Sequence, residues 1–168
     1  FTEGLQLFSS FAILLNFPRF GKMKGMGQIV TYSIRDESLH VEAMTKLFRE
    51  FIQENLNIWT DDFKKEIYQI CREMVKLEDK FLDLVFDMGD IQGLTKDDMY
   101  KYNRYIADRR LLQLGLKPNY KQNENPLPWL DEVMGVEHQN FFEGRATTYM
   151  KAGLRGSHKN ITFADLSE

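Results

Sequence analysis

Apolar residues recur along this chain in steps of three and four, which is the spacing of one face of an α-helix. The pattern predicts four long helices, over residues 2–16, 24–55, 60–88 and 95–114. Pro18 and Gly21 predict a break after the first helix, because proline cannot continue a helix and glycine is conformationally free. Residues 117–128, rich in Asn, Gln and Pro, predict a loop. The expected fold class is all-α.

Capping chemistry supports the starts of the third and fourth helices. Thr60 or Asp61 can act as the N-cap of the third, since both side chains accept hydrogen bonds from free helical N–H groups. Thr95 followed by Asp98 resembles a capping box at the start of the fourth. Residues 129–134 predict a further short helix.

The second helix carries two ionisable side chains on its apolar side. That side is formed by Met26, Ile29, Val30, Ile34, Val41, Met44, Leu47, Phe48, Phe51 and Ile52. Glu37 and His40 fall between Ile34 and Val41, so the spacing points both toward the expected core. A charged carboxylate is costly to bury without a partner. Glu-x-x-His on an inner helix face is how dimetal carboxylate proteins present ligands, although a solvated helix edge or a satisfied polar pair would give the same pattern.

The first helix offers a further candidate metal ligand, Glu3. Leu7 and Phe11 follow it at i+4 and i+8, so the three residues share one side of the helix. This arrangement predicts a ligand beside a dry pocket whose walls include Leu7 and Phe11. A helix, a turn and a returning helix fit into the 34 residues that separate Glu3 from Glu37. Both carboxylates could therefore lie at the same depth.

The composition is that of a globular protein, since 43% of the 168 residues are hydrophobic and 13% are aromatic. The net charge of −3, with both signs interspersed, gives no case for nucleic acid or a membrane surface as partner. The single cysteine, Cys71, suits a reducing cytoplasm and is expected to be buried filler. No apolar run reaches the roughly 18 residues of a transmembrane helix.

Several polar residues on the third and fourth helices are expected to be structural. Glu78 interrupts the apolar stripe of the third helix, where it either pairs with an arginine or lies at the stripe edge. Asp108, Arg109 and Arg110 could form an ion-pair network. Beyond residue 152 the sequence is small and polar, which predicts a flexible tail.

Five segments in order resemble the small, radical-generating subunit of class I ribonucleotide reductase, called R2. They are Thr2-Glu3-Gly4 with Phe8-Ser9-Ser10-Phe11, then 35–40 (RDESLH), 105–112 (YIADRRLL), 125–129 (NPLPW) and 140–149 (NFFEGRATTY). The resemblance runs from residue 1 to about 156 and covers the second half of an R2 chain. It implies a ferritin-like helical bundle, R2-like and partial, that lacks the N-terminal helices, with residues 157–168 as a C-terminal tail. In R2 proteins the segment equivalent to Asp108, Arg109 and Arg110 is structural framework.

The resemblance also implies a chemistry. R2 proteins hold a dinuclear metal centre that oxidises a nearby side chain. The metal is usually iron, and variants use manganese or one ion of each metal. The hole passes to a large catalytic subunit that reduces ribonucleotides. Glu3, Glu37 and His40 match metal ligands of the family. Asp36 matches an aspartate that couples the metal site to radical or electron transfer, and a carboxylate behind a metal-bound histidine is ordinary chemistry at such sites.

Two departures from R2 bear on function. The preceding half, which supplies an aspartate, a glutamate, a histidine and usually the radical tyrosine, has no counterpart in residues 1–168, so the chain is expected to begin mid-domain. The segment after Tyr149 contains no tyrosine, whereas R2 tails commonly carry a relay tyrosine, and residues 162–166 could instead dock on the large subunit. Expected partners are a complementary N-terminal half of R2, the large subunit and a second copy in an R2-type homodimer.

Two other functions remain open from the sequence. The chain could be a non-catalytic helical interaction module, or an R2-like ligand-binding oxidase on the same fold. Retention of Glu3, Glu37 and His40 favours a metal protein over a bare interaction module. The match of Asp36 and of residues 141–149 to R2 favours the reductase over the oxidase.

Overall fold

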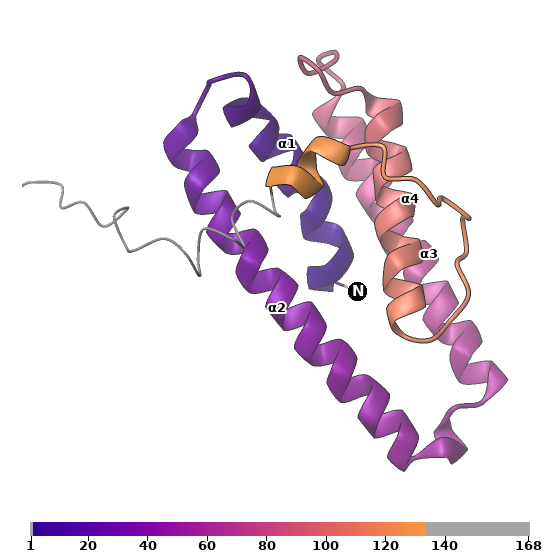
Figure 1. Ribbon diagram of the computed structural model, residues 1–168. Coiled ribbons are helices and arrows are strands. Elements are labelled where there is room, and N and C mark those ends of the chain that lie inside the picture. The colour runs from indigo at the N-terminus through magenta and orange to yellow at the C-terminus, as the bar shows by residue number, and fades with distance from the viewer. Residues whose placement is uncertain (1, 134–168) are drawn as a thin grey trace, which may run out of the picture.

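The computed structural model describes residues 2–133, which are mainly helical, with the longest connection over residues 114–127. The elements are η1 (Thr2–Gln6), α1 (Leu7–Arg19), α2 (Lys24–Glu54), η2 (Leu56–Ile58), α3 (Asp61–Val85) and α4 (Lys96–Gln113). Helix α1 lies between α2 and the antiparallel pair formed by α3 and α4 (Figure 1). The part of the chain that the structure describes contains no β-strand, only one isolated bridge between Ile91 and Leu94. The all-α prediction is confirmed.

Helix α1 is the central element of the core. It is buried on almost every side, through Phe8, Ser9, Phe11, Ala12, Ile13, Leu15 and Asn16. A helix that is apolar nearly all round must be covered on all sides to be stable, and α2 and α4 both pack against it. The buried side-chain amide of Asn16 donates a hydrogen bond to the Gln92 carbonyl oxygen at 2.9 Å.

Helix α1 is longer than the sequence predicts. It continues through Pro18 to Arg19, because a proline in the last turn removes only one helical hydrogen bond. The ring of Pro18 packs against α2 at Gly27, where any Cβ atom would collide with it. Gly27 therefore lets the two helices approach closely. Helix α1 ends three residues later than the sequence predicts.

Helix α2 covers α1 along a narrow line and leaves much apolar surface exposed. Val30, Ile34 and Ile52 are buried, whereas Ile29 and Leu47, predicted on the same core face, are exposed. Met44 and Phe51 are exposed as well. The apolar residues of α2 are therefore spread over more than one face, and only one of these faces is covered by residues 2–133.

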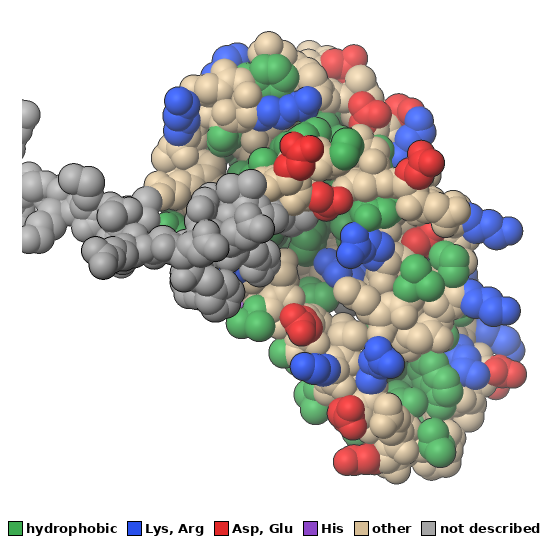
Figure 2. All heavy atoms as spheres, viewed as in Figure 1, with side chains coloured by type: hydrophobic (Ala, Val, Ile, Leu, Met, Phe, Trp, Pro, Cys, Tyr) green, Lys and Arg blue, Asp and Glu red, His purple; other side chains and the backbone are tan. Residues whose placement is uncertain are grey.

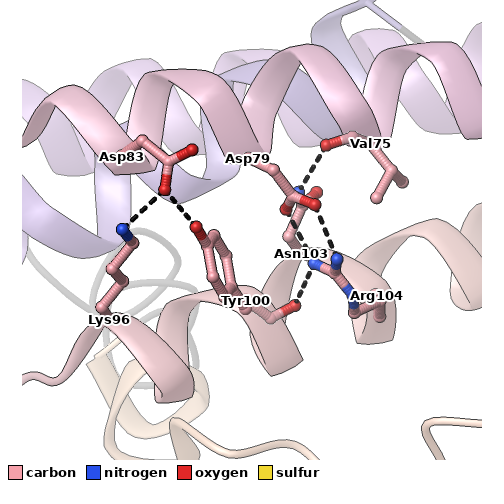
Figure 3. A network of polar contacts seen from close by, with 7 residues as sticks. All are labelled: Val75, Asp79, Asp83, Lys96, Tyr100, Asn103 and Arg104. Atoms are coloured by element: carbon pink, nitrogen blue, oxygen red, sulfur yellow. Dashed lines mark hydrogen bonds and ion pairs between the residues drawn. The ribbon is translucent and has the colours of Figure 1, made fainter.

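Helices α3 and α4 are joined by a polar network as well as by apolar packing. Asp79 accepts two hydrogen bonds from Arg104, at 2.7 and 2.6 Å, and one from Asn103 Nδ2 at 3.0 Å (Figure 3). Asn103 Nδ2 also donates to the Val75 carbonyl oxygen at 3.2 Å. Nearer the end of α3, Asp83 binds Lys96 at 2.6 Å and the hydroxyl of Tyr100. These contacts fix the register between the two helices.

The predicted N-caps of α3 and α4 are confirmed, and some helix ends differ from the prediction by a few residues. Thr60 accepts from the Phe63 N–H and begins α3, and Thr95 and Asp98 form a reciprocal capping box at the start of α4. Helix α3 ends at Val85, three residues earlier than predicted. Residues 128–133 are helical, as predicted for the start of the short helix. The boundary at 156, the 140–149 segment and the tail lie outside the described residues.

The visible face in Figure 2 carries acidic and basic side chains interspersed with hydrophobic ones. Cys71 is fully buried, and burial raises the pKa of its thiol to about 11, as expected for structural filler. Among the described helices, none is both long enough and apolar enough to cross a lipid bilayer.

Candidate metal centre

Glu3 is carried by η1, a single turn of π-helix that continues into α1. The π-helix, with its i→i+5 hydrogen bonds, is rare and occurs mostly as single turns, often at functional sites. This turn contacts α2, α3 and α4 and so lies where all of them meet. The backbone position of Glu3 is therefore determined by the whole bundle rather than by α1 alone.

Glu37 and His40 lie one turn apart on α2, and His40 Nδ1 is 3.4 Å from Glu37 Oε2. One donor atom from each of Glu3, Glu37 and His40 lies within 4.8 Å of the other two. Donors on opposite sides of one ion, bound at about 2.0 to 2.4 Å, are at most about 4.8 Å apart. The three groups therefore fit the coordination sphere of one ion, and two carboxylates with an imidazole suit iron or manganese.

The three groups lie at an accessible edge of the described bundle rather than in its core. The side chain of Glu37 is 24% exposed and that of His40 is 58% exposed. Glu3 is also exposed. The expectation that Glu37 and His40 point into the core is wrong for residues 2–133, because only the line of α2 through Val30 and Ile34 is covered by α1.

A hollow of about 510 Å³ opens beside Glu3. Its lining is mostly apolar and comes from η1, α2, α3, α4 and the residue that follows α4: Glu3, Gly4, Val41, Met44, Thr45, Phe48, Ile67, Ile70, Arg110 and Leu114. Leu7 and Phe11 are not in this lining, since Leu7 is exposed and Phe11 is buried with Phe8 in the core. Their role as pocket walls stays a prediction.

Arg110 reaches from α4 to the turn that carries Glu3. Its Nε donates to the Gly4 carbonyl oxygen at 2.6 Å, and its guanidinium lies 4.9 Å from the centre of the Phe8 ring. Burial lowers the pKa of Arg110 to about 10, which leaves the group charged at neutral pH. Sequence reasoning missed this contact, because it joins residues 106 positions apart in the chain.

The sequence allowed an ion-pair network of Asp108, Arg109 and Arg110, but these three described residues make separate contacts instead. Asp108 is buried and accepts backbone N–H groups of the following loop, from Asn119 at 2.7 Å, Tyr120 at 2.9 Å and Gln122 at 2.9 Å. Arg109 donates to the Tyr105 hydroxyl. Successive residues on a helix point in different directions, which is why three neighbouring charges serve three separate contacts.

Asp36 stands beside the ligand pair on the exposed side of α2. Its carboxylate is 3.7 Å from the guanidinium of Arg35, and its side chain is 63% exposed. Asp36 precedes Glu37 in the chain.

The sequence model for "Ribonucleotide reductase, small chain" matches residues 1–126. The chain belongs to the ribonucleotide reductase small-chain family. It is 47% identical over 158 residues to a probable ribonucleoside-diphosphate reductase small subunit of Invertebrate iridescent virus 3, an alignment that covers 93% of this chain and 42% of that protein. It is 38% identical to a ribonucleoside-diphosphate reductase subunit beta of Chlamydia pneumoniae, covering 90% of this chain and 43% of that one.

Solved structures of the family have the same fold. The R2 subunit from Clostridium botulinum superposes with a TM-score of 0.75 at 31% identity, covering 79% of this chain and 42% of that chain. A putative class I ribonucleotide reductase from Bacillus halodurans gives 0.71 at 32% identity, covering 76% and 41%. The prediction of an R2-like helical bundle is confirmed, and the chain spans somewhat under half the length of these relatives.

Proposed function

We propose that this small chain contributes Glu3, Glu37 and His40 to the dimetal centre of a radical-generating subunit of class I ribonucleoside-diphosphate reductase. The observation that carries the proposal is the convergence of the three donor atoms within 4.8 Å, on a framework shared with R2 structures. Iron is the proposed metal, with manganese or a mixed manganese and iron centre as alternatives. A cytoplasmic location is part of the proposal, in keeping with a single buried cysteine.

Each residue has a distinct role in this proposal. Glu3 and Glu37 bring two negative charges that offset the charge of the ions, and His40 adds a neutral nitrogen ligand. When bound, the dimetal centre supplies the oxygen-dependent oxidation from which the family's radical arises. Asp36, adjacent to Glu37 and open on its outer side, holds the position through which charge would pass toward a docked partner.

The proposed partners follow from the number of ligands. Three protein donors do not complete a two-metal site, so we propose that the remaining donors come from a complementary N-terminal half of R2. The exposed edge occupied by Glu37 and His40 supports this assignment, because the site is open on the side away from α1. The large catalytic subunit and a second copy of the small chain complete the proposed assembly.

The proposal is tested by reconstitution. The chain would be combined with the N-terminal half of the viral relative, that relative's large subunit, Fe²⁺ and oxygen. A ribonucleoside diphosphate and a dithiol reductant would be supplied, and deoxyribonucleotide formation would be measured. We expect activity that falls at least 100-fold in Glu37→Ala and His40→Ala and stays within twofold in Glu42→Ala, an exposed carboxylate on the same helix.

Two results would count against the reductase. Iron uptake without deoxyribonucleotide formation would favour the oxidase alternative. Tight association with the N-terminal half but no iron uptake would favour an interaction module.

A further inference from the structure

The π-helical turn that carries Glu3 needs support from outside its own helix. A single π-turn fixes five residues with few hydrogen bonds of its own, and its geometry is less favourable than that of the α-helix. Residues Thr2–Gln6 are held instead by contacts with α2, α3 and α4. A side chain that donates a hydrogen bond to this turn is therefore in a position to set where Glu3 lies.

Arg110 is such a side chain. It donates from Nε to the carbonyl oxygen of Gly4, the residue next to Glu3, at 2.6 Å. Its own direction is fixed twice, because Nη1 donates to Gln113 Oε1 at 2.9 Å and the guanidinium lies over the Phe8 ring. A planar guanidinium held in this way has little rotational freedom left. Its hydrogen bond to Gly4 therefore fixes the position of the π-helical turn relative to α4.

Gly4 provides a second, independent sign that this approach is specific. A Cβ atom at Gly4 would lie 2.9 Å from Arg110 Nε and 3.2 Å from Val41 Cγ2. Any side chain here would thus push the turn away from α4 and from α2 together. The absence of a side chain at position 4 lets the backbone beside Glu3 sit directly between Arg110 and the helix that carries Glu37 and His40.

Arg110 and Glu3 also line the same hollow, so the arginine lies behind the ligand rather than at a distant surface. We infer that Arg110 is a positioning residue for the metal ligand Glu3, and that it acts through the Gly4 carbonyl oxygen. The inference rests on the proposed metal site. Without Arg110 the turn can relax toward α-helical hydrogen bonding, and Glu3 then loses its register with Glu37 and His40.

The test compares Co²⁺ binding by the full chain and its variants, measured by titration and by the visible absorption of bound Co²⁺. We expect Arg110→Met to weaken Co²⁺ binding at least 10-fold and to change the Co²⁺ spectrum, since groups behind a metal ligand affect affinity by about 10 to 100-fold. Gly4→Ala should act in the same direction, and Arg110→Lys, which keeps one donor, should stay within threefold. Arg109→Met is the matched control and should leave binding unchanged. Wild-type affinity and spectrum in Arg110→Met would overturn the inference.

A second measurement separates this inference from the proposed function. Amide hydrogen exchange of a peptide covering the first eight residues should rise at least 10-fold in Arg110→Met, with exchange in α3 unchanged. If the wild-type chain binds no Co²⁺ even when the N-terminal half of the viral relative is present, the proposed metal site fails, and this exchange result still decides whether Arg110 holds the turn. Unchanged exchange in the first eight residues of Arg110→Met would overturn the inference whatever the metal result.

Discussion

At the scale of single residues, Glu78 is a carboxyl group that the fold removes from water. It is 4% exposed, between α3 and α1. Burial raises the pKa of its carboxyl from 4.5 to about 7, a hydrogen bond with Ser9 partly opposes this rise, and the neighbouring charge of Asp79 adds to it. The sequence allowed either an arginine partner or a place at the stripe edge, and the structure shows a buried carboxyl beside a serine.

This pKa predicts a pH dependence of stability with a definite sign. The folded state holds the Glu78 proton up to about pH 7, whereas the unfolded chain releases it near pH 4.5. The stabilising contribution is therefore full below about pH 4.5 and is lost as the pH rises through 7. At about 1.4 kcal/mol per pKa unit, the loss amounts to about 3 kcal/mol.

Urea unfolding between pH 4.5 and pH 8 would measure this effect in the wild-type chain and in Glu78→Gln. The glutamine variant should lose less stability over this range, by about 3 kcal/mol, because its amide does not titrate. Glu66→Gln, an exposed position on the same helix, should follow the wild type. Parallel curves for all three proteins would show that Glu78 is ionised in the folded state at neutral pH.

At the scale of elements, the contact between α3 and α4 depends on one partly buried ion pair more than on the surface pairs. Asp79 and Arg104 form two short hydrogen bonds, and both side chains are less than a third exposed. Asp62 and Lys65, on α3, form a single contact at 2.8 Å and are largely exposed. Ion pairs that are bidentate and shielded from water interact more strongly than exposed ones.

Double-mutant cycles to alanine would compare the two pairs by urea unfolding. We expect a coupling free energy of about 1 to 2 kcal/mol for Asp79 with Arg104. For Asp62 with Lys65 we expect about 0.5 kcal/mol or less, which should fall further in 1 M salt. Equal couplings for the two pairs would contradict a special role for Asp79 in fixing the register of α3 and α4.

Elements were predictable from sequence where local chemistry decides them. The caps at Thr60 and Thr95 depend on hydrogen bonds within one turn, so residue type and spacing sufficed. The covered face of α2 was not predictable, because the helix carries apolar residues on several sides and periodicity alone does not say which side meets α1. Arg110 and Gly4 likewise meet only after the helices have packed.

The candidate site divides in the same way. The i, i+3 spacing of Glu37 and His40 guarantees that they are neighbours on α2, and the length between Glu3 and Glu37 allows a return to the same depth. The structure brings the three donor atoms together. It also places them at an exposed edge of the described bundle. That exposure depends on how the helices pack, so no local sequence pattern predicts it. Metal binding by these residues stays a prediction.

At the scale of the whole molecule, the exposed apolar side chains of α2 dominate the expected behaviour in solution. Ile29, Leu39 and Leu47 are 67%, 64% and 62% exposed and lie on one side of the helix. Exposed apolar side chains along one side of a helix favour association. We therefore expect the chain to self-associate at micromolar concentration when no other chain covers α2.

Sedimentation velocity would test this expectation with a triple variant, Ile29→Ser, Leu39→Ser and Leu47→Ser. The variant should be mainly monomeric, with a thermal midpoint within a few degrees of wild type, because these positions make little contact in the described fold. Serine at Glu42, Lys46 and Glu50, exposed polar positions of α2, should leave the association unchanged. A wild-type chain that is monomeric at tens of micromolar would contradict the prediction.

The metal centre proposed for this chain requires Glu3, Glu37 and His40 to bind the same metal ion. Crystals of the chain grown anaerobically with Fe²⁺, measured on both sides of the iron absorption edge, would locate any bound iron directly. We predict an anomalous difference peak within about 2.5 Å of donor atoms from all three residues. That peak should be absent in Glu37→Ala crystals. A peak held by other residues, or no peak at saturating Fe²⁺, would contradict the account.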